Sequence, residues 1–335
     1  GLRFLVAMGV GGEWAVASAL VAEVFPQRAR VYAQSIFHAS SVLGTYLAVA
    51  AGTFIIANPN LGFSISLFGS EIFLSSWRIA FLLGVIPPLL IIWIRLSIRE
   101  PAKWVEAKAA SLTETTVRPG RIHDLFSPGL KRATLVGVTL AAVGMATFWG
   151  VHIFGKDKMR KLVEAPHRAK IKQDATQEEV KAALKPHESE IKRGEMLGMF
   201  LVTTGGGLGL VFFGPFSERV GRRRAFLYFH LGGLISALIL FLIPMPKAGL
   251  ILFLPVFGFL TLGMHAGYAV YFPELFPTHL RSTGAGFCFN VGRILAVPAL
   301  LGSGWLQDTV MKGNPNAMEH AASLLSGLYL LAAVI

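Results

Sequence analysis

The chain has 335 residues, of which 53% are hydrophobic and only 15% are charged. A soluble domain has about 25% charged residues, so too few polar residues are present here to cover a globule of this size. The formal charge of +12 comes from basic residues that lie between apolar segments, which is typical of loops beside a membrane rather than of a nucleic-acid surface. The single cysteine, Cys288, excludes a disulfide and a multi-cysteine metal site within these residues.

Apolar segments recur along the chain, and about 20 apolar residues suffice to cross about 30 Å of hydrocarbon. The pattern predicts an all-α polytopic membrane protein. Because the sequence starts and stops within apolar segments, we expect it to be part of a longer membrane protein. The nine expected spans are residues 2–24, 31–56, 77–97, 131–152, 196–214, 225–244, 249–272, 283–306 and 321–335.

Two longer polar segments interrupt this series. Residues 98–130 separate the first three spans from the last six, and residues 153–195 lie within the second group. In the latter segment, Thr176 and Glu179 have the spacing of a capping box, which predicts a short surface helix. The histidines in this segment and directly before it are too widely spaced for a familiar metal motif, so we expect a solvated loop without a metal site; they are His152, His167 and His187.

One charged motif occurs twice at a junction between spans. Residues 23–30 read EVFPQRAR and residues 274–281 read ELFPTHLR, so both have the pattern Glu-x-Phe-Pro-x-x-x-Arg at an offset of 251 residues. Gly12 and Gly263 align at the same offset. We interpret the two copies as a structural repeat of two helical halves. Parallel repeats of this kind build one large class of transporters, with the substrate site between the halves.

The repeated motif has the residues of a gate. The proline ends the helix and fixes the turn. Glutamate and arginine then lie at neighbouring helix ends, where they can pair within or between the halves and must separate during a transport cycle; the four residues are Glu23, Arg30, Glu274 and Arg281. The alternative is that these charges only anchor the helix ends at the lipid surface.

Several segments resemble the major facilitator superfamily. Residues 214–224 read GPFSERVGRRR, which is similar to the signature loop Gly-x-x-x-Asp-Arg-x-Gly-Arg-Arg, with Glu218 in place of the usual aspartate. REPAKW at 99–104 is a looser match to a charged element of its sugar and metabolite porters. GVGGEW at 9–14 and GFCFNVGR at 286–293 resemble the branch that symports protons with organic acids, such as sialic or aromatic acids.

The resemblance implies a major facilitator fold of twelve helices in two halves, of which helices four to twelve would be present. Residues 1–97 would then be the second part of the N-terminal bundle, 98–130 a cytoplasmic linker, and 131–335 the C-terminal bundle. Positive charge alone leaves the orientation open, but the resemblance places the short charged junctions in the cytoplasm and residues 153–195 outside. It also implies that Glu218, Arg219 and Arg222 clasp a neighbouring helix end; lipid anchoring is again the alternative.

Two ionisable residues lie about half-way along a predicted span, where a charge costs at least about 2.5–3.5 kcal/mol and therefore indicates function. Glu13 in the first span is a candidate proton carrier, because burial and nearby cations tune the pKa of a carboxyl group. Arg293 in the eighth span is a candidate ligand for an anionic substrate, because a guanidinium binds carboxylates through two hydrogen bonds. A purely structural ion pair, even between these two, is the alternative.

Three further polar residues are candidates for the same substrate or proton site. His38 and His265 can titrate near neutral pH, although a lone helical histidine is more often a hydrogen-bonded packing residue. Asn290 lies three residues before Arg293 and would share its helix face.

No P-loop, HExxH or GxSxG motif is present, so we expect neither an ATP-driven pump nor an enzyme. We expect a carrier, without a cofactor, that moves a small organic acid or related metabolite with protons by rocking its two halves. It would act as a monomer in the plasma (inner) membrane. A sugar porter of the same fold is the nearest alternative, and a membrane sensor whose output domain lies outside these residues is an alternative from another class.

Overall fold

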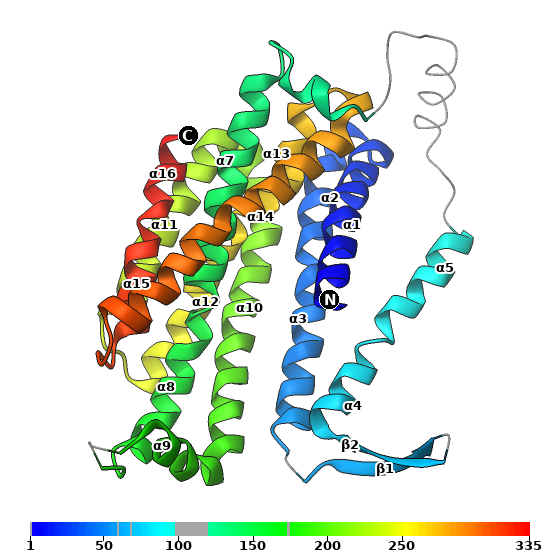
Figure 1. Cartoon of the computed structure of the whole chain (residues 1–335). Helices are drawn as coiled ribbons and strands as arrows, with labels where there is room; N and C mark the ends of the chain where they lie inside the picture. The colour runs from blue at the N-terminus through cyan, green and yellow to red at the C-terminus, as the bar shows by residue number, and fades with distance from the viewer. Residues whose placement is uncertain (1, 59, 68, 98–119, 173–174) are drawn as a thin grey trace.

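The computed structural model describes residues 2–58, 60–67, 69–97, 120–172 and 175–335. Long helices and one β-hairpin make up the fold (Figure 1). Seven of the described helices are long and apolar enough to cross a membrane, which confirms the expected helical membrane fold. The REPAKW segment and most of the predicted linker lie outside the described residues, and the described chain resumes at Gly120.

In the first group of helices, the chain reverses direction at the charged junction of residues 23–30, between α1 and α2 (Figure 1). Pro26 takes an extended conformation between the first two helices, since it cannot continue the hydrogen bonding of α1. The second predicted span, 31–56, is interrupted at Ser40, where the hydroxyls of Ser40 and Ser41 donate to the carbonyls of Phe37 and His38 at 2.6 and 2.7 Å. The elements are α1 (Leu2–Val24), α2 (Gln27–Ala39), α3 (Ser41–Ala50) and the π-helical turn η1 (Ala51–Ile56).

The third predicted span, 77–97, is not one continuous helix. It consists of α4 (Ser76–Leu83), the 3-10 turn η2 (Pro87–Leu89) and α5 (Leu90–Ser97), because Pro87 and Pro88 lack the N–H groups that would continue α4. A β-hairpin precedes it, with β1 (Gly62–Leu67) antiparallel to β2 (Ser70–Ser75). Gly69 has a φ of 78°, which glycine adopts readily at a tight turn. The sequence analysis did not foresee this hairpin.

The second group of helices contains the remaining spans. The span Lys247–Leu275 is divided at Met264 and His265 into two helices. The elements are η3 (Ile122–Phe126), α7 (Lys131–Thr147), η4 (Phe148–His152), α8 (Gly155–Arg168), α9 (Gln177–Leu184), η5 (Lys185–His187), α10 (Glu188–Val220), α11 (Arg222–Leu242), α12 (Lys247–Gly263), α13 (Ala266–Leu275), η6 (Thr278–Leu280), α14 (Arg281–Trp305), η7 (Leu306–Val310), α15 (Ala317–Ser326) and α16 (Leu328–Val334).

The expected solvated loop at 153–195 is largely helical, and this corrects the sequence interpretation. The span that starts at Lys131 continues to Arg168, and α10 has 33 residues, which makes it about 50 Å long and longer than the hydrocarbon is thick. Ion pairs within and between these extensions stabilise them, such as Lys156 with Glu195 and Arg168 with Glu164. The expected capping box of Thr176 and Glu179 is confirmed at the start of α9. We call residues 153–195 the polar cap.

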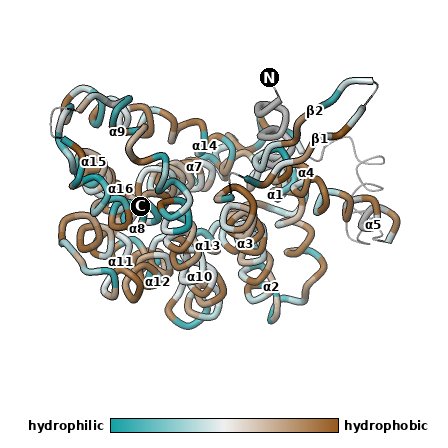
Figure 2. The backbone as a smooth tube through the Cα atoms, turned by 90° about the horizontal axis from the view of Figure 1, so that it is seen from below, coloured by the Kyte–Doolittle hydropathy of each residue, from teal (hydrophilic) through white to brown (hydrophobic). Residues whose placement is uncertain are grey.

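The two groups of helices lie side by side, with the polar cap and the hairpin at one end (Figure 1). Hydrophobic residues line most of the helices, whereas hydrophilic residues gather around α9 (Figure 2). The core of the second group depends on glycines. A Cβ on Gly205 of α10 would lie 1.8 Å from the carbonyl oxygen of Pro255 on α12, and one on Gly258 would lie 2.0 Å from that of Val202. Small residues therefore bring these two backbones into contact.

Candidate functional site

The two copies of the repeat meet along their equivalent helices. The hydroxyl of Ser18 on α1 donates to the carbonyl of Ala269 on α13 at 3.3 Å, and these residues are separated by the repeat offset of 251. The first helix of one copy, α1, packs on α14, and its equivalent in the other copy, α13, packs on α2. This exchange of partners is what a pseudo-two-fold axis between the two copies requires. We call the boundary between α1–α3 and the second group of helices the seam.

The two charged junctions lie at the same end of the seam, opposite the polar cap (Figure 1). Arg281 Nη1 lies 3.9 Å from Glu23 Oε1, and both side chains are mostly buried, with 17% and 13% exposed. Arg281 also donates through Nε to the carbonyl of Pro273 at 3.1 Å. The glutamate of one copy therefore pairs with the arginine of the other copy across the seam.

Arg222 is the centre of a second charged cluster at this end. Its Nη2 and Nε atoms donate to the two carboxylate oxygens of Glu274 at 3.0 and 3.2 Å, and Nη2 also contacts Glu218 at 2.9 Å. Gly221 allows this contact, because its φ of 86° turns the chain sharply between α10 and α11. The arginine of the signature loop thus holds the end of α13, where the second Glu-x-Phe-Pro junction begins.

The other two gate candidates make no such pair among the described residues. Arg219 is exposed near the end of α10. The Nε of Arg30 is buried and has no hydrogen-bond partner in the part of the chain that the structure describes.

Aromatic and basic side chains from both sides of the seam gather about half-way along α1. The indole Nε1 of Trp14 donates to His38 Nδ1 at 3.1 Å, and the indole ring stacks on Phe289 of α14 with ring centroids 4.1 Å apart. Since an indole can only donate, Nδ1 of His38 carries no proton in this arrangement. We call Trp14, His38, Phe289 and Arg293 the seam cluster.

Arg293 completes the seam cluster. Its guanidinium lies over the ring of Phe289, the residue that stacks on Trp14, at 4.8 Å from the ring centroid. Its side chain is half-buried, and it forms no ion pair with any residue that the structure describes. Glu13 is exposed, and no ion pair joins it to Arg293 within the described residues. The alternative of a structural ion pair between them is therefore not observed.

Asn290 bridges the seam beside this cluster. Its Nδ2 donates to the carbonyl of Gly11 on α1 at 3.1 Å and to that of Gly286 at 2.9 Å. Only a glycine fits opposite it, because a Cβ on Gly11 would lie 2.5 Å from the Asn290 Oδ1. The amide that was expected to bind a ligand thus already uses both N–H donors to hold α14 against α1.

His265 lies in the core of the second group, and no hydrogen bond or ring contact joins it to the seam cluster within the described residues. It occupies the break between α12 and α13, is 3% exposed, and contacts the rings of Phe148 and Tyr268 at centroid distances of 5.3 and 5.1 Å. Its Nε2 has no hydrogen-bond partner among the described residues. His152, which was expected in a solvated loop, is also buried in this core and contacts Thr261 Oγ1 at 2.7 Å.

Sequence analysis missed three residues of the seam. Trp14 and Phe289 were seen only as parts of motifs, although the offset of 251 relates Trp14 to His265 and His38 to Phe289. Extending the repeat past the charged junctions would have found them. Gln34 lies one turn before His38 on α2, is 1% exposed, and neither polar atom of its amide has a partner among the described residues. No sequence signal distinguishes it from a surface glutamine.

Most of the chain matches one protein family. Residues 1–300 match the family described as the Major Facilitator Superfamily. The chain belongs to the Major Facilitator Superfamily. This superfamily consists of membrane transporters, and the long apolar helices confirm the expectation of a multi-pass membrane protein.

Three relatives within the Major Facilitator Superfamily are similar to nearly all of this chain. A protein of Cupriavidus pinatubonensis named "probable 4-methylmuconolactone transporter" is 26% identical over 94% of this chain and 63% of its own length. The cis,cis-muconate transport protein of Acinetobacter baylyi is 26% identical over 90% of this chain and 64% of its own. A sialic acid transporter of Escherichia coli is 25% identical over 89% and 62%. The chain therefore spans less than two thirds of the length of each.

Proposed function

We propose that this chain forms the greater part of a secondary active transporter that moves a small organic acid, or a related metabolite with a carboxylate, together with protons. Its two halves would alternate access to a site at the seam cluster. The protein would act in the plasma (inner) membrane, as a monomer. The observation that carries the proposal is Arg293, a half-buried guanidinium on the seam that has no acidic partner within the described residues.

The chemistry of Arg293 supports an anionic substrate. A guanidinium half-way along an apolar helix is costly unless a partner neutralises it. Phe289 stabilises one face of it through a cation–π contact, which leaves the N–H groups at its edge for a planar carboxylate. The relatives named for muconate, methylmuconolactone and sialic acid transport carry compounds of this class, which supports the same assignment.

The contact between Trp14 and His38 supports proton coupling. A proton that binds Nδ1 of His38 removes the acceptor of the Trp14 hydrogen bond. Trp14 is stacked on Phe289, which in turn lies under Arg293. Protonation of His38 would therefore loosen a stack that ends at the proposed substrate ligand. Gln34, buried without a described partner one turn away, is a candidate hydrogen-bond donor to the same substrate.

The test is uptake of radiolabelled cis,cis-muconate and sialic acid by cells that express the full-length protein, with and without a protonophore. We expect Arg293→Leu to abolish uptake of the anionic substrate while membrane insertion stays normal. Arg132→Leu is the matched control, because Arg132 is exposed at the start of α7, outside the seam.

Two results would contradict this proposal. Normal uptake by the Arg293→Leu variant would remove Arg293 from the substrate site. Uptake that persists after collapse of the proton gradient would exclude proton coupling, and competition by neutral sugars instead of carboxylates would favour a sugar porter.

A further inference from the structure

Two histidines and a glutamate converge in the polar cap, away from the seam cluster (Figure 1). One ligand atom from each of His167, His187 and Glu190 lies within 4.8 Å of the others. We propose that these residues form a divalent-cation site suited to Zn²⁺, with one ligand from the end of α8, one from the end of η5 and one from the first turn of α10. Histidine nitrogens with one carboxylate oxygen are ligands that zinc prefers, and three protein ligands leave a fourth position for water.

The packing of α8 against α10 fixes this meeting point. A Cβ on Gly198 would lie 2.9 Å from Met159 Cβ, and one on Gly194 would lie 2.7 Å from a methyl group of Val163. Each step of four residues backward on α10 therefore matches a step of four forward on α8. The next step pairs Glu190 with His167, whose Oε2 and Nε2 atoms are 3.2 Å apart. The two helices are antiparallel, and their glycines set the register that brings the ligands together.

The distances suit a metal ion between the ligands. Two ligand atoms at about 2.0–2.1 Å from one zinc ion, at a tetrahedral angle, are about 3.3 Å apart. His167 Nε2 and Glu190 Oε2 are 3.2 Å apart, within hydrogen-bond distance, and a shared zinc ion would leave this separation almost unchanged. The rings of His167 and His187 are stacked with centroids 3.7 Å apart and an interplanar angle of 21°, so one ring must rotate from this stacked position for both nitrogens to bind one ion.

A cation fits this arrangement better than protonated histidines do. Two imidazolium rings stacked at 3.7 Å would repel each other. Neutral imidazoles can share one metal ion, whose charge Glu190 partly balances.

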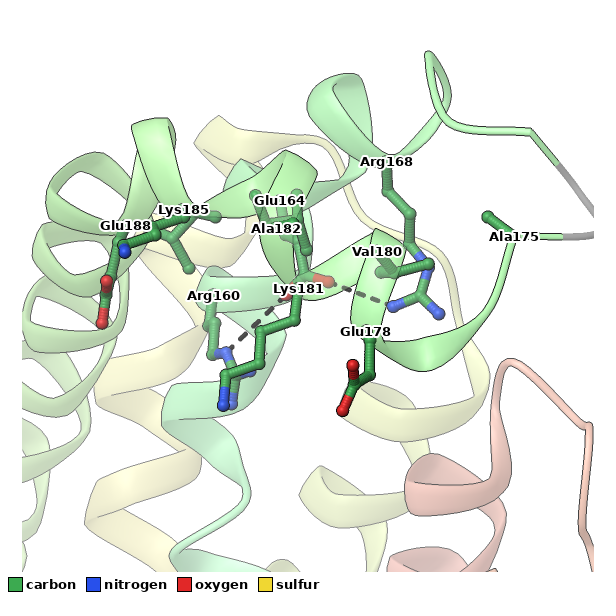
Figure 3. A pocket seen from close by; sticks show the side chains of 12 residues that line it. Arg160, Glu164, Arg168, Ala175, Glu178, Val180, Lys181, Ala182, Lys185 and Glu188 are labelled. Carbon is green, nitrogen blue, oxygen red and sulfur yellow. Dashed lines mark hydrogen bonds and ion pairs between the residues drawn. The ribbon is translucent and has the colours of Figure 1, made fainter.

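The basic residues beside the site do not oppose a cation strongly. Arg168, next to His167, contacts Glu164 at 3.1 Å, and Arg160 approaches the same carboxylate at 3.7 Å. Figure 3 shows both guanidinium groups turned toward Glu164 in the neighbouring pocket of about 820 Å³. Glu190 itself is 63% exposed, so a metal ion can reach it from solvent.

A bound ion would join the end of α8 to the start of α10 and so close the polar cap. The metal ion would add stability because it binds the folded cap and not the unfolded chain. The site shares no residue with the seam cluster, so the inference does not depend on the proposed transport function.

The test is Zn²⁺ binding to the full-length protein, purified in detergent without a polyhistidine tag and treated with EDTA. We expect isothermal titration calorimetry to show one site with a Kd of about 1 μM or tighter. Zn²⁺ should also raise the Tm. Glu190→Gln should weaken binding at least about tenfold, and His167→Ala with His187→Ala should abolish it. Glu190 is exposed, so its variant keeps the fold.

The matched control is His123→Ala with His279→Ala, which removes two histidines outside the cap and should bind Zn²⁺ like the wild type. Arg293→Leu should also bind it normally, which separates this inference from the transport proposal. Wild-type affinity in both the Glu190 and the double-histidine variants would overturn the proposal. So would the absence of binding at Zn²⁺ concentrations up to about 100 μM.

Discussion

The inside of the second group of helices and the seam between the two groups are held together in different ways. Inside the group, α10 and α12 approach so closely that a single added Cβ would lie 1.8–2.0 Å from a backbone carbonyl oxygen. Along the seam, the contacts are made chiefly by side chains. Examples are the Arg281–Glu23 pair at 3.9 Å and the Asn290–Gly11 hydrogen bond at 3.1 Å.

This difference indicates which parts can move. Backbones in contact cannot slide without a clash, because packed interiors are not continuously deformable. Side-chain pairs can separate and exchange partners with water when they reach the surface. The Arg222–Glu274 pair, which lies within the second group, and the ion pairs of the polar cap can remain intact while the Arg281–Glu23 pair across the seam opens. Each helical group is therefore expected to move as a rigid body.

The largest expected effect is the loss of the close contact inside the second group. In Gly205→Ala the new Cβ would lie 1.8 Å from the Pro255 carbonyl, so α10 and α12 must separate. We expect a loss of about 3 kcal/mol in stability and a lower Tm of the purified protein. Gly44→Ala on α3 is the matched control, because nothing lies within 4 Å of its Cβ position. Equal Tm values for the two variants would mean that the second group is not rigidly packed at this point.

A smaller effect is expected when the ion pair across the seam is broken. Glu23→Gln removes the charge that faces Arg281, which should favour opening at the junction end by about 1 kcal/mol, or about fivefold. The readout is labelling of Ala22→Cys in a Cys288→Ala background, since Ala22 is 1% exposed and lies one turn from Ser18 on the seam. Glu195→Gln in the polar cap should leave labelling unchanged. A Glu23→Gln variant that labels like its parent would show that the pair does not close this end.

An effect of similar size is expected when one hydrogen bond of the seam cluster is removed. Trp14→Phe keeps an aromatic ring against Phe289 but removes the Nε1 donor to His38. A net loss of about 1 kcal/mol is typical of one hydrogen bond, so we expect uptake to fall about threefold to tenfold. The measurement is initial uptake rate, with Trp305→Phe, an exposed tryptophan, as the control. If the variant with both Trp14→Phe and His38→Phe loses the full sum of the two single effects, the two residues act independently and the proposed coupling is wrong.

Much of the fold was accessible from sequence, because apolar length and helix-breaking prolines are local properties. The spans, the signature loop and the capping box of α9 all depend on residues within a few turns of each other. The break of the third span at Pro87 and Pro88 also depends on local residues, but the sequence analysis missed it because the whole segment is hydrophobic. The continuation of α8 and α10 beyond the membrane depends instead on ion pairs such as that of Lys156 with Glu195, which are 39 residues apart.

The candidate site was only partly accessible. Arg293 and His38 stand out from the sequence because charged or titratable groups are rare in apolar helices. Their partners do not, since Phe289 and Gln34 differ from ordinary core or surface residues only in what they face. His167 and His187 were set aside because their spacing along the chain fits no local motif, and Glu190 was not considered.

By itself, then, the sequence determined that this protein spans a membrane with long helices and contains two copies of one charged junction. Hydrophobicity and turn chemistry act locally, and a duplicated motif can be recognised by comparing two segments of the sequence. Only the tertiary structure decided that Glu23 pairs with Arg281, that Trp14 stacks on Phe289, and that the cap histidines face each other. These contacts depend on which helix faces meet and at what height, and packing between distant helices sets both.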